Sequence, residues 1–417
     1  MKLESSPILA SSTPELRNAA LKAIGEALSA NASAIFAENA KDLKAADENN
    51  IPTPVRKRLK FDESKLSSVL AGISDLISLP DPLCKITLSR ELDEGLELTR
   101  FTCPIGVIGI IFEARPDALI QISTLCLKSG NCAVLKGGSE TKNTNRILFD
   151  IIYKAAVDAG LPQGCLFRAE ERSEIAELLQ CDTSVDLLIP RGSNAFVRYI
   201  MDNTRIPVMG HADGICHSYV HKAADFGKAV RVVTDAKTQY VSVCNATETL
   251  LVDREIANDF LPVLAAALRE KNVKLRCTAE LMPVLNGELM RDDEFNTEYL
   301  DYILSVKAVS GIDEAIRHIN TFGSHHTDCI ITEDPAAADK FCSLVDSANC
   351  YVNCSTRFAD GYRYGFGAEV GISTSKLHAR GPVGLEGLVT YKYRLNGNGH
   401  IVADYSEGRK SFHFRDK

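Results

Sequence analysis

The sequence predicts an α/β protein built on doubly wound parallel sheets, and three observations support that fold class. Residues 106–112 (GVIGIIF) form an apolar, β-rich run of the kind that is buried on both faces of a parallel sheet. Similar runs, among them CAVLK, VDLLIP and DCIIT, alternate with segments of helical pattern. The chain has 417 residues, which is too long for one ordinary core and indicates two or three domains.

The expected elements follow one another in a regular order. A helix is predicted over residues 13–48, where Thr13 and Pro14 supply a capped first turn and alanine and leucine dominate. A second helix is predicted over residues 62–77. Strand–helix units begin at the GVIGIIF run, and a second series of such units occupies residues 218–352.

Two segments depart from this pattern because they read as β-hairpins. Residues 86–102 alternate apolar and polar side chains around a DEG turn, and residues 388–405 carry NGNG at their centre. The first hairpin lies between helices and a buried strand, so we expect an arm rather than a part of the core. Isolated hairpins are marginally stable in water and need a partner to pack against.

Composition and charge exclude several classes of protein. The net charge is −8 with acids and bases mixed along the chain, which argues against a nucleic-acid partner because such proteins carry a basic stripe. No window of about 18 apolar residues occurs, so we expect no membrane span. Residues 1–13 lack the pattern of a secretory signal peptide, and a cytoplasmic protein is the simplest expectation.

Thirteen cysteines occur, and most of them lie inside apolar runs. A reduced, buried cysteine behaves as a small hydrophobic residue. Cys350 and Cys354 are four residues apart, but no second ligand pair follows them and the chain contains no C-x-x-C motif. The sequence therefore predicts no metal site.

Conspicuous residues follow four of the predicted strands, in the segments FEARP, LKGGSE, IPRGSN and GHADGICH. Ligands of doubly wound sheets bind beyond the carboxyl ends of the strands, so these loops are candidates for a binding site. Glycines there let backbone N–H groups approach a phosphate, although the same loops also suit ordinary turns. No segment fits the G-x-G-x-x-G dinucleotide fingerprint in its strand–turn–helix context.

Cys244 lies in the most informative segment, residues 235–252 (DAKTQYVSVCNATETLLV). It ends a short β-rich piece and has polar neighbours in Gln239, Asn245 and Thr247. A structural cysteine needs no polar neighbours, so the segment favours a position in an exposed loop. From these residues alone, a catalytic thiol and a structural cysteine both remain open.

Six longer segments between residues 104 and 388 are informative together. They are PIGVIGIIFEARPDA (104–118), LKSGNCAVLKGGSE (127–140), DLLIPRGSN (186–194), GHADGICH (210–217), SVCNATETLLV (242–252) and STRFADGYRYGFGAEVGISTSKLHARGPVGLEGL (355–388). In these segments the chain resembles the γ-glutamyl phosphate reductase family, a divergent branch of the aldehyde dehydrogenase superfamily. The resemblance implies an aldehyde dehydrogenase-like fold with two doubly wound α/β domains and a β-hairpin oligomerisation arm.

The resemblance also implies an activity, the NADPH-dependent reduction of γ-glutamyl 5-phosphate to glutamate-5-semialdehyde in proline biosynthesis. Cys244 aligns with the superfamily's nucleophile and is expected to form a thioester as phosphate leaves. Ordinary aldehyde dehydrogenases hydrolyse their thioester with a glutamate base, and His211 stands in its place. His211 is expected to protonate the leaving group or the thiohemiacetal oxygen, and the alternative is that it only packs against a loop. Val241 and Ser242 stand where the family usually has proline, a departure that affects loop stiffness.

The resemblance points to several residues around the substrate. Arg115 stands where ordinary aldehyde dehydrogenases have an oxyanion-binding asparagine, and its guanidinium suits either the acyl phosphate or a substrate carboxylate. The alternative is a solvated arginine at a strand end. The backbone N–H of Asn245 is expected to complete an oxyanion hole. Arg357, Arg363 and His378 are candidates for the glutamyl amino and carboxylate groups.

The expected cofactor is NADPH or NADP, and the resemblance assigns six residues to it. Lys136 is expected to reach the adenosine ribose. Ser139 takes a position that is often glutamate in NAD-preferring relatives, which relieves repulsion with a 2′-phosphate, although Glu140 is adjacent. The full expected set is Lys136, Gly138, Ser139, Gly192, Ser193 and Glu369.

The implied domains are a cofactor-binding domain (1–85 and 104–234), a catalytic domain (235–385) and oligomerisation hairpins (86–103 and 386–417). The hairpins predict a homodimer or homotetramer, and the pathway suggests functional coupling to a separate glutamate 5-kinase. Two alternatives remain. One is an acylating or oxidising aldehyde dehydrogenase with another substrate, and the other is a binding protein that lost the chemistry. The joint presence of the candidate thiol, arginine and lysine disfavours the second alternative.

Overall fold

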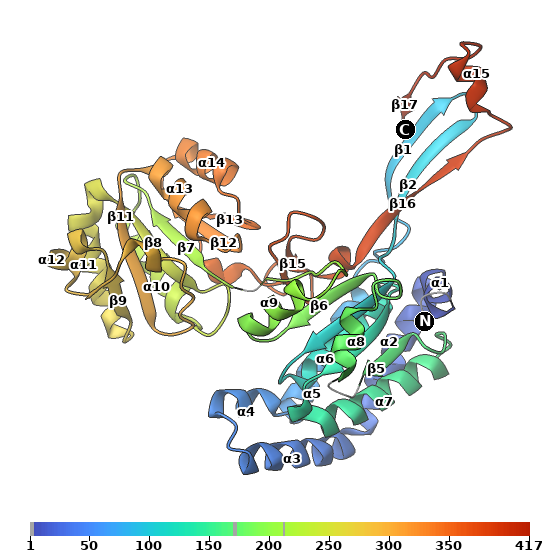
Figure 1. The fold of residues 1–417 in the computed structure, drawn as a ribbon, viewed down its shortest axis with the longest axis horizontal. Helices are drawn as coiled ribbons and strands as arrows, with labels where there is room; N and C mark the ends of the chain where they lie inside the picture. Colours follow the sequence, from blue (N-terminus) through green and yellow to red (C-terminus); the bar gives the residue numbers. More distant parts are fainter. Residues whose placement is uncertain (1–3, 170–172, 212) are drawn as a thin grey trace.

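The computed structural model describes residues 4–169, 173–211 and 213–417. Two α/β lobes are adjacent, and a narrow arm of β-strands projects away from them (Figure 1). The first lobe contains the N-terminal helices, and the C-terminus lies on the arm. Each lobe contains a parallel sheet, which confirms the predicted α/β fold class.

The N-terminal segment does not form the single helix predicted over residues 13–48. It forms α2 (Pro14–Ala30) and α3 (Ala32–Glu48), and the backbone leaves the helical conformation at Asn31 between them. Thr13 caps α2 as predicted, because its side chain accepts a backbone hydrogen bond of 3.2 Å. The other helices here are α1 (Ser5–Ala10), α4 (Thr53–Leu59) and α5 (Glu63–Ser78), the last of which confirms the second predicted helix. No helix within the described ranges is long and apolar enough to cross a membrane.

The first lobe is built on a four-stranded parallel sheet in the order β5-β4-β3-β6. All six residues of β3 are buried, as the apolar GVIGIIF run predicts. Side chains of α2, α5, α6 and α7 join the strands in one hydrophobic cluster. The elements are β3 (Val107–Phe112), α6 (Pro116–Lys128), β4 (Cys132–Gly137), α7 (Lys142–Asp158), β5 (Leu166–Ala169), α8 (Ser173–Leu179), β6 (Leu187–Arg191) and α9 (Asn194–Asp202).

The second lobe contains a seven-stranded parallel sheet in the order β10-β9-β11-β8-β7-β12-β13. Its strands are β7 (Cys216–Val220), β8 (Thr247–Asp253), β9 (Lys274–Cys277), β10 (Glu288–Leu289), β11 (Ile303–Val309), β12 (Thr327–Ile331) and β13 (Asn349–Val352). Its helices are α10 (Phe226–Thr238), α11 (Arg254–Glu270), α12 (Met282–Leu285), α13 (Ile312–Phe322) and α14 (Pro335–Leu344). Successive strand residues enter different clusters: Val220 packs with α10 and α11, whereas Tyr219 packs with α13 and α14. Both faces of this sheet are therefore covered by helices.

The boundary between the lobes differs from the predicted one, which fell between residues 234 and 235. β7 pairs in parallel with β8 and β12, and α10 packs on the same sheet. β7 precedes the predicted boundary and α10 extends across it, so residues 216–234 belong to the second lobe. Residues 203–215, which join α9 to β7, form the connection between the two lobes.

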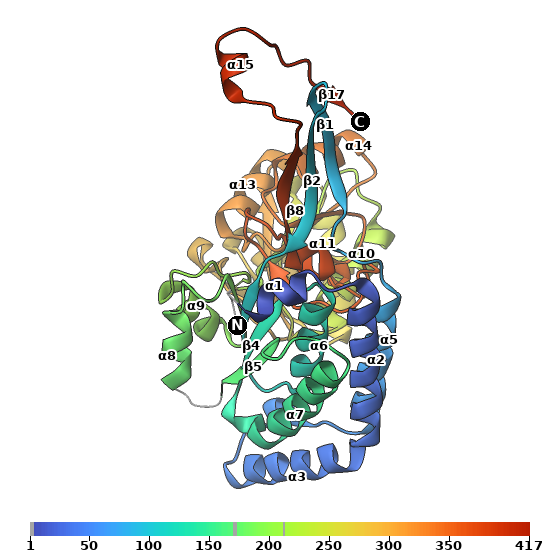
Figure 2. The ribbon, with the colours of Figure 1, turned by 90° about the vertical axis from the view of Figure 1, so that its right-hand side faces the viewer.

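The arm is one antiparallel sheet in the order β16-β2-β1-β17. The first hairpin is present, but residues 388–405 do not form the second one. β16 pairs with β2 from end to end, and a helical turn follows where the returning strand was expected. That prediction is wrong because the open edge of β2 supplies the hydrogen-bond partners. The elements are β1 (Ile86–Asp93), β2 (Leu96–Pro104), β16 (Val389–Asn396), α15 (Val402–Ser406) and β17 (Arg415–Asp416). Figure 2 shows how narrow the arm is.

An aromatic cluster in the second lobe contains a buried histidine. The ring of His318 lies 4.7 Å from the rings of Phe295 and Phe322 and 5.5 Å from that of His217, measured between centroids. Burial lowers the pKa of His318 to about 2, with smaller contributions from His217 and Lys307. The imidazole is therefore neutral in the folded protein at every pH at which an exposed histidine titrates.

His318 is expected to make folding pH-dependent. The unfolded chain binds a proton at this residue below a pH of about 6.5 and the folded chain does not, so below that pH the free energy of unfolding decreases as the pH is lowered, by roughly 1.4 kcal/mol per unit. Urea unfolding followed by circular dichroism at several pH values checks this. His318→Phe should reduce the slope below pH 6.5. Parallel profiles for the variant and the parent would show that His318 does not contribute.

Candidate active site

Cys244 lies in the loop between α10 and β8 and is half-buried. The thiol of Cys216, at the start of β7, donates a hydrogen bond of 3.2 Å to the carbonyl of Cys244. A Cβ atom at Gly214 would lie 2.3–2.5 Å from the O, Cα and Cβ atoms of Cys244. Only glycine allows this approach of two backbones. The connection between the lobes therefore packs directly against the backbone of Cys244.

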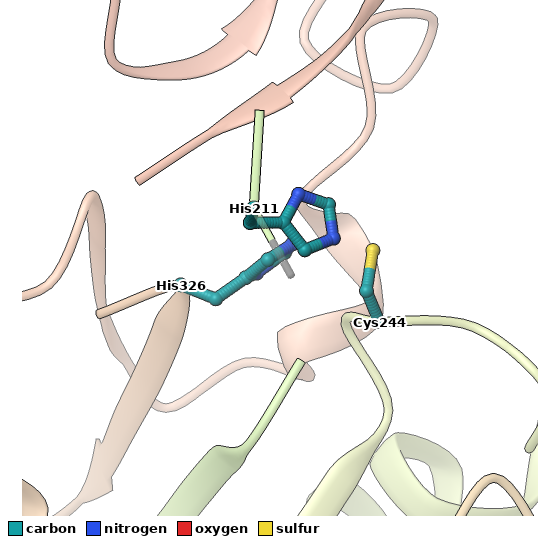
Figure 3. Close-up of side chains that lie close together, drawn as sticks. All are labelled: His211, Cys244 and His326. Carbon is teal, nitrogen blue, oxygen red and sulfur yellow. The ribbon is translucent and has the colours of Figure 1, made fainter. Parts of the chain in front are cut away.

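His211 lies in the same connection, and its imidazole faces the sulfur of Cys244 (Figure 3). Its Nδ1 lies 2.8 Å from the carbonyl oxygen of Ile372, in β14 (Gly371–Ser373), which pairs with β15 (Gly381–Val383). A carbonyl only accepts, so Nδ1 carries the proton and Nε2 presents a lone pair. Burial is the main cause that lowers the pKa of His211. The ring is thus prepared to accept a proton from the thiol.

His326 is one of the site residues that the sequence analysis missed. It precedes β12 and has no exposed surface, and its ring meets that of His211 edge-on at 4.8 Å between centroids. Its Nδ1 lies 2.8 Å from the hydroxyl of Thr327. One ligand-type atom each of His211, Cys244 and His326 lie within 4.8 Å of one another. The sequence around His326 (HHT) gave no indication of this cluster, because residues 211, 244 and 326 are far apart in the chain.

Asn245 and Arg357 lie together behind the nucleophile. Both are buried, and the guanidinium of Arg357 donates to the side-chain oxygen of Asn245 and, at 2.9 Å, to that of Gln239. The amide of Asn245 donates to the carbonyl of Ala359 at 2.8 Å, while Thr356 donates to the carbonyl of Asn245 at 2.7 Å. Arg357 therefore holds Asn245 in place, and the substrate binding expected of it stays a prediction.

The other candidates for substrate binding lie at the surface. Arg115 is exposed at the start of α6, directly beyond β3. Arg363 is exposed and donates to the carbonyl of Arg357 at 2.6 Å. His378 is exposed in the loop between β14 and β15. This hydrogen bond connects Arg363 with Arg357 and Asn245. Among the described residues, no hydrogen bond connects His378 with Cys244.

Arg191, which was not among the candidates, ends β6 close to the nucleophile. A Cβ at Gly371 would lie 2.9 Å from its Nη1, so the guanidinium lies against the backbone of β14. Burial and the nearby charge of Arg115 lower the pKa of Arg191. Glu369 is close, and burial raises its pKa to about 6 although Arg191 opposes the shift. Glu369 accepts a 2.9 Å hydrogen bond from the N–H of Gly361. Its position near Arg191 and His211 fits a ligand-binding carboxylate.

A cavity of about 700 Å³ lies beyond the carboxyl ends of β3 and β4. It brings together three of the six expected cofactor residues, Lys136, Gly138 and Ser139. Gly192 and Ser193 are outside its lining, but the N–H of Ser193 donates to Glu113, a lining residue, at 3.1 Å. The lining also contains the basic residues Lys142, Arg146 and Arg168, which the sequence analysis missed because they belong to α7 and β5 rather than to a glycine loop.

Glu140 lines the same cavity, and its carboxylate has a defined partner. It accepts a hydrogen bond of 2.5 Å from the N–H of Ala114, in the loop after β3. The carboxylate also covers Gly138, where a Cβ would lie 2.2 Å from it. Glu140 therefore ties two loops of the cavity together, and Ser139 is left exposed beside it.

Known proteins resemble this chain over most of its length. The aldehyde dehydrogenase family model matches residues 7–286. The γ-glutamyl phosphate reductase of Ruminiclostridium cellulolyticum is 57% identical over 404 residues, which are 97% of this chain and 94% of that protein. The enzyme of the same name from Acetivibrio thermocellus is 58% identical over 409 residues, 98% of this chain and 95% of that one.

Solved structures give the same result. The crystal structure of γ-glutamyl phosphate reductase from Thermotoga maritima is 37% identical, with a TM-score of 0.93 over 95% of this chain and 97% of that one. An acetylating aldehyde dehydrogenase from Geobacillus thermoglucosidasius, at 17% identity and a TM-score of 0.64 over 95% of each chain, shares the fold. This chain belongs to the aldehyde dehydrogenase family and, within it, to the γ-glutamyl phosphate reductases. The resemblance stated from the sequence is thereby confirmed.

The contact between Gly214 and Cys244 predicts the effect of one added methyl group. Gly214→Ala should force the nucleophile loop to shift and should destabilise the protein by roughly 1–3 kcal/mol, the usual cost of overpacking. The rate of alkylation of Cys244, followed by mass spectrometry of its peptide, should change together with the urea midpoint. Gly227→Ala is a matched control in the exposed first turn of α10, where the new Cβ meets only Asp225 at 3.4 Å. Equal behaviour of the two variants would show that the approach at Gly214 is not restrictive.

Proposed function

We propose that this protein reduces γ-glutamyl 5-phosphate to glutamate-5-semialdehyde with NADPH and releases phosphate, the second step of proline biosynthesis from glutamate. The observation that carries the proposal is the facing pair of Cys244 and His211, in a chain that is 57–58% identical to proteins named for this activity. The activity is proposed for the cytoplasm, in functional coupling with a separate glutamate 5-kinase that supplies the acyl phosphate.

The first chemical step forms the thioester. His211 accepts the proton of the Cys244 thiol at Nε2, and the sulfur attacks the acyl carbon. The bond from that carbon to the phosphate oxygen breaks, and phosphate leaves with the bonding electrons. Arg115 and Arg191 contribute positive charge beyond β3 and β6, where the leaving phosphate would be stabilised. The sequence led us to expect only an acid role for His211. The base role is added because Nδ1 donates its proton to the carbonyl of Ile372, which leaves the lone pair of Nε2 to accept a proton.

Charge also develops on the acyl oxygen during both steps. The N–H of Asn245 directly follows the nucleophile and is the proposed donor to that oxygen. Its side chain is held by Arg357 and Ala359, and its carbonyl by Thr356. Donors that are fixed before the reaction stabilise the oxyanion without reorganisation. Arg363, which is anchored to Arg357 but exposed, is the candidate for the substrate's carboxylate.

The residues present fit a nicotinamide dinucleotide phosphate. When bound, the cofactor supplies the hydride that reduces the thioester carbonyl. We assign Lys136, Gly138 and Ser139 to the adenosine end, with Gly192 and Ser193 beside the diphosphate and Glu369 at the nicotinamide ribose. Four basic side chains around the cavity favour the additional 2′-phosphate of NADPH, and these are Lys136, Lys142, Arg146 and Arg168.

The arm supports a homodimer or homotetramer. Along β16, every residue after Val389 is exposed, including Tyr391, Tyr393 and Leu395 at 54–56%. A thin sheet with apolar side chains in water lacks the packing that gives such sheets stability. A second copy of the chain packed on the arm would provide it.

The decisive assay runs the reaction backwards, because the acyl phosphate is unstable. With glutamate semialdehyde and inorganic phosphate, the protein should reduce NADP⁺ in preference to NAD⁺, and the rate should depend on phosphate. Cys244→Ala should lower kcat by at least about 1,000-fold in both directions because no thioester forms. Cys342→Ala removes an exposed thiol elsewhere and should retain full activity. Phosphate-independent oxidation would instead indicate an ordinary aldehyde dehydrogenase.

The proposed assembly is tested by mass in solution. The chain has a mass of 45.5 kDa, and light scattering at micromolar concentration should give at least twice that value. Tyr393→Asp should shift the mass toward the monomer, because a charge would be buried in the arm interface. Tyr302→Asp places the same change at an exposed tyrosine of the second lobe and should leave the mass unchanged. A monomeric wild type would contradict the proposal.

A further inference from the structure

Three side chains with metal-ligating atoms converge at the nucleophile. They come from the connection between the lobes, the loop before β8 and the residue before β12, and one such atom of each lies within 4.8 Å of the others (Figure 3). A thiolate and two imidazoles are ligands that Zn²⁺ prefers. The sequence analysis expected no metal because it searched for closely spaced ligands.

The hydrogen bonds of the two histidines leave the same nitrogen available on each ring. Nδ1 of His211 is occupied by the carbonyl of Ile372 and Nδ1 of His326 by the hydroxyl of Thr327. Nε2 of His326 is fully buried and has no hydrogen-bond partner among the described residues. A buried imidazole nitrogen without a partner is costly, and a ligand would satisfy it. Histidines that bind metals through one nitrogen and a protein oxygen through the other show this arrangement.

We propose that Cys244, His211 and His326 form a binding site for Zn²⁺ or another thiophilic divalent cation, and that occupation of this site reversibly inhibits the enzyme. Water completes a tetrahedral coordination sphere. Binding of the cation depends only on the three side chains. Inhibition rests on the proposed function, because a coordinated thiolate no longer attacks an acyl phosphate.

Binding of the cation requires the three ligand atoms to move closer together. Tetrahedral zinc with these ligands places the ligand atoms roughly 3.3–3.6 Å apart. The present separations of up to 4.8 Å must therefore shorten by at most about 1.2–1.5 Å. Rotation of Cys244 about its Cα–Cβ bond provides such a movement, since its side chain is half-buried and projects toward the histidines.

The ligand set also predicts which cations compete. Mg²⁺ and Ca²⁺ prefer oxygen ligands and should neither bind nor inhibit at this site. Zn²⁺, Co²⁺ and Cd²⁺ accept nitrogen and sulfur together. The site is thus distinct from the magnesium sites of enzymes that bind nucleotide phosphates.

Cobalt titration tests binding without using activity. Co²⁺ added to the purified enzyme should give a thiolate-to-cobalt charge-transfer band and the visible bands of tetrahedral cobalt, saturating at one ion per chain, and Zn²⁺ should displace it. Cys244→Ser should abolish the charge-transfer band, and His326→Asn should weaken Co²⁺ affinity at least about tenfold. His325→Asn is the matched control, because His325 is adjacent, half-exposed and bonded to the carbonyl of Asp346 at 2.6 Å. It should titrate like the wild type.

A second measurement links the site to inhibition. Zn²⁺ should inhibit the wild type and His325→Asn equally, with recovery on addition of a chelator, and excess Mg²⁺ should have no effect. A charge-transfer band that persists in Cys244→Ser, or equal cobalt affinities for His326→Asn and His325→Asn, would overturn the site. If the phosphate-dependent assay fails while the cobalt bands follow the expected pattern, the error lies in the proposed function and not in the metal site.

Discussion

The active site depends on the contact between two stretches of backbone, Gly214–Cys216 and the loop that carries Cys244. A Cβ at Gly214 has no room, and the thiol of Cys216 donates to the carbonyl of the nucleophile. The same connection carries His211 three residues earlier. One segment therefore sets both the position of the sulfur and the position of the imidazole that faces it. Since this segment also joins the lobes, their relative placement affects the distance between the imidazole of His211 and the sulfur of Cys244.

A buried ion pair supports the nucleophile loop from inside the second lobe. Nζ of Lys237, near the end of α10, lies 2.6 Å from the carboxylate of Glu248 in β8, and neither side chain is exposed. Burial pushes both groups toward their neutral forms, raising the pKa of Glu248 to about 7 and lowering that of Lys237. Glu248 also accepts from the N–H of Leu300 at 3.2 Å. The pair spans the loop of Cys244 and closes it at its base, and the loss of either partner would leave an uncompensated buried charge.

Much of the fold was predictable because it follows from local patterns. The GVIGIIF run required burial on both faces, and Thr13 with Pro14 marked a helix start. The lobe boundary was not predictable in this way, because HSYVH has the same pattern in either sheet and only its pairing with β8 and β12 assigns it. The prediction of a second hairpin was wrong for the same reason: residues 389–396 form a strand, but the strand that pairs with them is β2.

The residues of the candidate site also fall into those that sequence segments indicated and those that only the folded structure reveals. Cys244 and His211 were found because they lie in segments that resemble a family, and the structure brings them together. His326 has no local pattern that distinguishes it from other residues at strand ends, whereas Arg191 lies in the conspicuous IPRGSN segment but was not selected there. The contacts of Arg357 were not predictable either: its donors face Asn245 and Gln239, and its expected role in substrate binding stays a prediction. A side chain's partners depend on packing that its own neighbours in sequence do not specify.

The base of the arm has a mechanical consequence. Asn131, buried without exposed surface, accepts from the N–H of Gly106 at 2.8 Å and donates to the carbonyl of Leu388 at 2.8 Å. Gly106 lies between β2 and β3 and Leu388 precedes β16, so one side chain joins the bases of the arm strands β2 and β16. β2 and β3 are separated by only two residues. The arm is thus joined to the first lobe by short, hydrogen-bonded connections. A neighbouring subunit that packs against the far end of the arm would fix the orientation of that lobe.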